Sequence, residues 1–78
     1  MTELTATPNE PTADQRLANA RALRSAGEIE QATALASDIV ADHPNHVAAL
    51  RLLGQLARRD GNAELAITSF SQALAQSP

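Results

Sequence analysis

Residues 47–78 have the sequence VAALRLLGQLARRDGNAELAITSFSQALAQSP, and this stretch decides the fold. Apolar and small side chains recur at spacings of three and four on both sides of Gly61, which is the pattern of two amphipathic helices. A glycine in this place fits the left-handed backbone position that often ends a helix. We therefore predict one helix over residues 45–60 and another over residues 62–76, with a tight turn between them.

The same helix-breaking residues occur 34 positions earlier in the chain. Gly27 stands at that interval before Gly61, and Pro44 stands at that interval before Pro78. An ordinary four-helix bundle has the same apolar periodicity, but it does not need equally spaced breakers, so the register favours an internal repeat. Pro44 ends the earlier pair, because the residue before a proline avoids helical geometry. The predicted helices of this earlier pair cover residues 13–26 and 28–42.

The start of the chain differs from the rest in composition. It is rich in Thr, Pro, Asn and Glu and has no apolar periodicity, which is typical of a flexible leader. Thr12 and Gln15 have the spacing of a capping box, and Asn45 offers an N-cap to the third helix. The predicted organisation is a leader over residues 1–12 and a helical domain over residues 13–78, divided into repeats at 13–46 and 47–78.

The repeated residues resemble the tetratricopeptide repeat, whose pattern is a large residue, Leu-Gly, an aromatic, Ala, Phe and a closing Pro. The matching positions of the second repeat hold Leu50, Leu53, Gly54, Ala57, Ala66, Phe70 and Pro78. Those of the first repeat hold Arg16, Asn19, Ala20, Leu23, Ala32, Ala36 and Pro44. The resemblance implies an all-α fold, in which two antiparallel helix-turn-helix repeats stack as a short right-handed α-solenoid.

The resemblance also implies a function. The first helix of each repeat is expected to line a concave groove that holds a peptide or a partner's helix, so that the chain acts as a scaffold or adaptor in protein–protein interaction. The alternative is an oligomerisation or structural segment of a larger bacterial protein, such as an enzyme with an N-terminal repeat region.

The basic residues are concentrated on the two helices expected to line the groove. All six are arginines, and they fall on the first and third predicted helices. The predicted groove residues are Leu17, Arg21, Arg24, Arg51, Gln55, Arg58 and Arg59. Two interpretations stay open: the arginines bind an acidic peptide or a terminal carboxylate, or they are solvated charges that partly offset the helix dipoles.

Several classes of function are disfavoured by composition. A net charge of −3 and a single aromatic residue argue against nucleic-acid binding. There is no apolar run of transmembrane length and no secretion signal, so we expect a cytoplasmic chain without a membrane partner. His43 and His46 flank a proline turn and have no third ligand in view, so we predict no metal site. We find no catalytic constellation and predict neither an enzyme nor a cofactor.

The last predicted helix has an apolar face that lacks a neighbour. Repeats of this kind bury their apolar stripes against one another, so the final stripe stays in water. Its residues are Ile67, Phe70 and Leu74, and we expect them to mediate a homodimer or to leave a marginally stable monomer. Phe70 is also predicted to be the largest contributor to the core of the second repeat, with a cost of roughly 3–5 kcal/mol for Phe70→Ala if the ring is fully buried.

Overall fold

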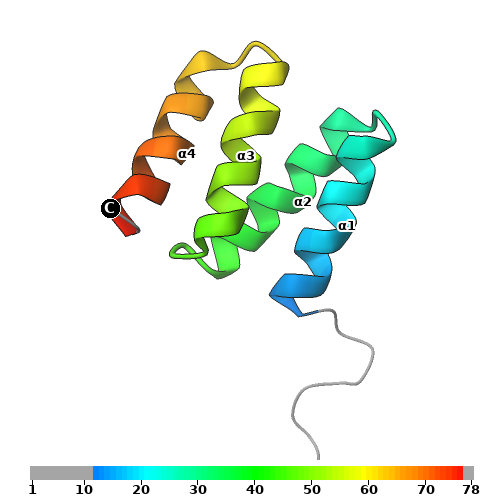
Figure 1. The fold of residues 1–78 in the computed structure, drawn as a ribbon, viewed down its shortest axis with the longest axis horizontal. Coiled ribbons are helices and arrows are strands. Elements are labelled where there is room, and N and C mark those ends of the chain that lie inside the picture. Colours follow the sequence, from blue (N-terminus) through cyan, green and yellow to red (C-terminus); the bar gives the residue numbers. More distant parts are fainter. Residues whose placement is uncertain (1–11, 77–78) are drawn as a thin grey trace, which may run out of the picture.

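Four helices and no strand make up residues 12–76, which are the residues described in the computed structural model (Figure 1). The helices are α1 (Ala13–Ser25), α2 (Ile29–Asp42), α3 (Val47–Arg59) and α4 (Ala63–Gln76). They form two antiparallel hairpins, α1–α2 and α3–α4, which confirms the predicted all-α repeat fold. The predicted leader lies outside the described residues except for Thr12, and so does Pro78.

The two hairpins turn in the same way, 34 residues apart. Gly27 and Gly61 have φ angles of +85° and +82°, in the left-handed region that glycine adopts without a steric cost. In both turns the residue after the glycine donates its N–H back across the end of the helix, which is the Schellman pattern. These bonds run from Glu28 to Leu23 and from Asn62 to Ala57, each at 2.8 Å.

The starts of the helices are capped to different degrees. Thr12 and Gln15 form the predicted capping box: the Gln15 N–H donates to Thr12 Oγ1 at 3.1 Å, and the Thr12 N–H donates to Gln15 Oε1 at 3.0 Å. Asn62 Oδ1 accepts from the Leu65 N–H at 3.2 Å at the start of α4. Glu28, which occupies the equivalent position at the start of α2, makes no side-chain capping bond.

The cap of α3 differs from the prediction. His46, rather than Asn45, is the N-cap, and its Nδ1 accepts from the Ala49 N–H at 3.2 Å. The reason lies in the preceding turn, which the His46 N–H closes by donating to the His43 carbonyl at 3.0 Å. Asn45 is held inside that turn, one residue too early to cap the helix.

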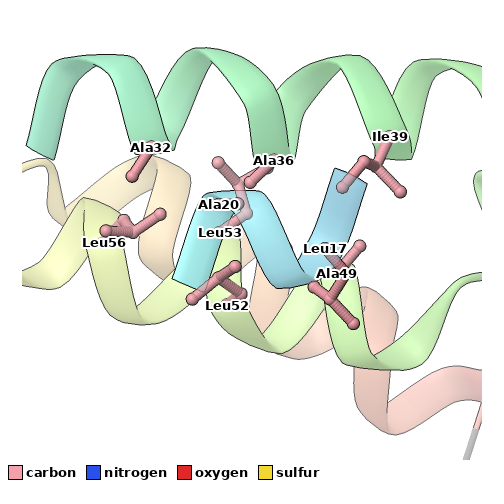
Figure 2. Packing of buried hydrophobic residues seen from close by; sticks show 9 residues of the cluster. All are labelled: Leu17, Ala20, Ala32, Ala36, Ile39, Ala49, Leu52, Leu53 and Leu56. Carbon is pink, nitrogen blue, oxygen red and sulfur yellow. The ribbon is translucent and has the colours of Figure 1, made fainter. Parts of the chain in front are cut away.

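The core lies between the two hairpins, with α3 at its centre. Among the described helices, α3 packs against α1, α2 and α4, whereas α4 packs against α3 alone. In Figure 2 the α2 side chains of the buried cluster point toward those of α1 and α3. The cluster consists of Leu17, Ala20, Ala32, Ala36, Ile39, Ala49, Leu52, Leu53 and Leu56. The many alanines let the helix backbones approach closely, and the leucines and Ile39 supply most of the buried volume.

Candidate functional site

A polar hollow lies where α1 and α3 run beside each other. It has a volume of about 440 Å³ and takes residues from both repeats. We call it the arginine hollow; its lining residues are Arg21, Arg24, Ala48, Arg51, Leu52 and Gln55. The α3 members follow spacings of three, one and three, so they share one face of that helix.

One hydrogen bond crosses the arginine hollow and joins the two repeats. Arg24 Nη1 donates to Gln55 Oε1 at 2.8 Å, between residues that are 31 positions apart in the sequence. Within residues 12–76 the ion pairs are Arg16–Asp42 and His46–Asp14, so no carboxylate of this part of the chain neutralises Arg21, Arg24 or Arg51. The hollow therefore gathers three positive charges, two on exposed side chains and one on the half-buried Arg24.

The structure brings together four of the predicted groove residues, namely Arg21, Arg24, Arg51 and Gln55. Leu17 does not join them, and its prediction as a groove residue is wrong. Only 6% of Leu17 is exposed, and the residue belongs to the core cluster. The reason is that α3 covers this part of the first repeat, whereas no helix of the described residues covers the equivalent part of the second.

Arg58 and Arg59 stay outside the arginine hollow. Both are exposed in the last turn of α3. Sequence reasoning missed Ala48 and Leu52, which form the hollow's apolar floor. Their spacing from Gln55 and from each other could have found them, because Leu52 lies three residues before Gln55 and four after Ala48.

A second hollow lies on the outer side of the second repeat and is mainly apolar. Its volume is about 520 Å³, and Arg51 and Gln55 separate it from the arginine hollow. We call it the α4 hollow; it is lined by Val47, Arg51, Gln55, Phe70, Ala73 and Leu74. Leu74 is 67% exposed and Ile67, nearby on α4 but outside the lining, is 66% exposed.

Phe70 forms part of this hollow instead of the buried core. Its side chain is half-buried, so the condition of full burial attached to its predicted contribution is not met. The ring lies over Gly54: a Cβ atom at that position would stand 2.9 Å from Cε1 and Cζ of the ring. The absence of a side chain at Gly54 thus lets α3 accept the ring, while the other side of the ring faces the hollow.

The histidines and acidic residues of the described chain do not form a metal site. Residues 12–76 contain no group of three histidine or acidic side chains arranged to hold a metal ion. His46 Nδ1 already serves the α3 cap, and its Nε2 lies 3.7 Å from Asp14 Oδ1. Across the same residues, no helix has both the length and the apolar character needed to cross a membrane.

Comparison with known proteins gives one family. The family model described as tetratricopeptide repeat matches residues 17–78, which include both hairpins apart from the first turn of α1. Searches of curated proteins and of solved structures gave no significant match.

Proposed function

Because the chain belongs to the tetratricopeptide repeat family, whose repeats are generally non-catalytic protein–protein interaction modules, we propose that its arginine hollow binds an acidic segment of a partner protein. The observation that carries the proposal is the meeting of Arg21, Arg24 and Arg51 from two helices. The chain as a whole is acidic, with a net charge of −3, so the hollow differs in sign from its surroundings.

The chemistry of the hollow supports a carboxylate ligand. An arginine carries five N–H donors in a planar fork that fits a carboxylate with two parallel bonds. Arg24 donates one hydrogen bond to Gln55 Oε1, and this bond fixes the position of its guanidinium before a ligand binds. A preorganised arginine loses less conformational freedom on binding than a mobile one. Ala48 and Leu52 give the bound segment an apolar surface beneath the charges.

The proposal is tested with a fluorescein-labelled hexaglutamate peptide, titrated with the full chain and followed by fluorescence anisotropy. Hexaglutamine of the same length is the uncharged control. We expect hexaglutamate to bind and hexaglutamine not to bind, and we expect binding to weaken as salt is raised because partly exposed charges are screened.

Arg21→Gln is the decisive variant, because Arg21 lines the arginine hollow and not the α4 hollow. We expect about a tenfold loss of affinity, since a hydrogen bond to a charged group contributes about 1.5–3 kcal/mol. Arg59→Gln is the matched control: it removes the same charge from an exposed position outside both hollows. If both variants weaken binding equally, the peptide binds only to the overall charge and the proposed site is wrong.

A further inference from the structure

We propose that the α4 hollow is a docking site for one amphipathic helix of a partner protein, which binds the second repeat as α3 binds the first. The α4 hollow shares Arg51 and Gln55 with the arginine hollow, but the proposal concerns its apolar wall of Phe70, Ala73 and Leu74 and does not rest on what the arginine hollow binds. It rests on the internal repeat, which places two equivalent surfaces in one molecule, one covered by a helix and one uncovered.

The covered surface belongs to the first repeat. Moving the lining of the α4 hollow back by 34 residues gives Ala13, Leu17, Arg21, Ala36, Ile39 and Val40. Three of these, Leu17, Ala36 and Ile39, are at most 6% exposed, and the other apolar members are partly buried against the core. The helix that covers them is α3, which packs against both α1 and α2.

The uncovered surface belongs to the second repeat. Within residues 12–76, α4 packs against α3 alone, and Leu74 remains 67% exposed where its equivalent Val40 is partly buried. The first repeat therefore shows what covers a surface of this shape: a helix whose apolar face meets the second helix of the hairpin.

The side chains of α3 indicate the apolar pattern of the docked helix. The α3 residues in the core cluster are Ala49, Leu52, Leu53 and Leu56, at spacings of three, one and three. This pattern places a small residue at the start, where the helix approaches closely, and leucines along the next two turns. A partner helix with the same face fits the α4 hollow by the same packing.

The Arg24–Gln55 contact between the repeats also predicts an acidic residue on the docked helix. Arg24 donates to Gln55 on the covering helix, and the residue equivalent to Arg24 in the second repeat is Arg58. Arg58 is exposed, and no carboxylate within residues 12–76 pairs with it. An acidic residue at the Gln55 position of a docked helix would meet Arg58 with a charge-assisted bond, which is stronger than the neutral amide contact.

A second copy of this chain is a poorer occupant. Head-to-tail stacking would place α1 of one copy in the α4 hollow of another. The exposed side of α1 then presents Asp14, Gln15 and Asn19, where α3 presents Ala48, Ala49 and Leu53. A symmetric contact of α4 with α4 brings together two α4 hollows, each lined by Arg51. The repulsion between the two arginines disfavours this dimer.

The probe is a labelled, capped peptide of residues 46–60 with Gln55→Glu, titrated with the full chain. It carries the apolar face of α3 and the acidic residue aimed at Arg58. We expect binding to the unmodified chain and a loss of about tenfold or more for Leu74→Glu, because an unpaired charge is costly in an apolar site. Gln72→Glu is the control, because Gln72 is exposed on α4, does not line the hollow and lies off the face that carries Leu74; it should leave the affinity unchanged.

The charge contact has its own test. Arg58→Gln should weaken the Gln55→Glu peptide several-fold and have a smaller effect on the peptide that keeps Gln55. Three results would overturn the proposal. The first is no binding to the unmodified chain. The second is equal binding to Leu74→Glu with helical circular dichroism intact, which means that the peptide binds at a site other than the α4 hollow. The third is a dimer of the free chain that light scattering detects and that Leu74→Glu dissociates. This result would assign the hollow to a second copy of the chain.

Discussion

Where the second repeat places Gly54 beneath the ring of Phe70, the first repeat has Ala20 and Ala36, both fully buried. The two hairpins thus use different pairs at equivalent positions. The second repeat pairs a glycine with a phenylalanine, and the first repeat pairs two alanines. Both keep the same turns and the same helix lengths, 13 residues for the first helix and 14 for the second. The comparison shows that the backbone repeat tolerates different side-chain pairs, as long as the space between the helices is filled.

The repeats differ more in what lies outside them than in how their own helices pair. In the first repeat, the hairpin face that lies toward the second repeat is part of the core, because α3 covers it. In the second repeat, the same face is the α4 hollow. Val40 and Leu74 mark the difference at equivalent positions, since Val40 is partly buried against the core and Leu74 is two-thirds exposed.

The largest expected effect comes from truncating a residue on each of these faces. Ile39→Ala should lower the free energy of unfolding by about 2–5 kcal/mol, because it leaves a cavity in the shared core. Leu74→Ala should change it by less than about 0.5 kcal/mol, as is usual for an exposed side chain. Urea denaturation followed by circular dichroism measures both. Ile39→Val, with an expected cost of about 0.5–1.5 kcal/mol, keeps the comparison measurable if the alanine variant does not fold. Equal losses for Leu74→Ala and Ile39→Ala would show that the outer face of α4 is covered in the free chain.

An intermediate effect is expected from the Gly54–Phe70 pair. Phe70→Ala should cost about 1.5–3 kcal/mol, less than a fully buried phenylalanine, because part of the ring faces the α4 hollow. Gly54→Ala forces the ring to move in the unmodified chain, since the new Cβ lies 2.9 Å from it. In the Phe70→Ala background that conflict is gone, and the same change should stabilise the chain by roughly 0.8–1.0 kcal/mol through helix propensity.

The double-mutant cycle of thermal or urea unfolding measures this coupling. The first repeat supplies the reference: Ala20→Gly should lose about 1 kcal/mol or more, with no aromatic ring involved. Additive effects of Gly54→Ala and Phe70→Ala would contradict the contact between the two positions.

The smallest effect concerns the caps of the second helix in each hairpin. Asn62→Ala should cost about 1 kcal/mol, because it removes the oxygen that accepts from the Leu65 N–H. Glu28→Ala at the equivalent position should cost less than half of that, because Glu28 makes no capping bond. Glu28→Asn should instead stabilise α2 by supplying the missing cap. Melting temperatures of the three variants test the order; a larger loss for Glu28→Ala than for Asn62→Ala would reverse the assignment.

Much of the fold could be predicted from local signals in the sequence. Gly27 and Gly61 fix the turns, and Thr12 with Gln15 fixes the first helix start, because these positions depend on neighbours within a few residues. The cap of α3 could not be predicted in this way. Asn45 is the better capping residue by type, but it lies inside the turn that the His46 N–H closes on the His43 carbonyl, and residue type alone does not show where that turn ends.

The candidate site was predictable to the extent that it follows helix faces. Arg21, Arg24, Arg51 and Gln55 were predicted to line one groove from two helices, and they lie together in the arginine hollow. The burial of Leu17 and the partial exposure of Phe70 have the same physical reason. The 34-residue register equates positions by sequence, but α3 covers the outer face of the first repeat only, so equivalent residues differ in burial. Exposure is a property of the neighbours, which a repeat pattern does not specify.

The contrast between the exposed side of α1 and the α4 hollow gives this short stack a direction. Asp14, Gln15 and Asn19 make the α1 side hydrophilic, whereas the α4 side is apolar. An assembly with two complementary ends adds unit after unit and produces fibres, since head-to-tail contacts that do not close propagate without limit. Within residues 12–76 the apolar end is the α4 side alone, so a helix bound there as proposed would leave a polar end that does not continue the stack.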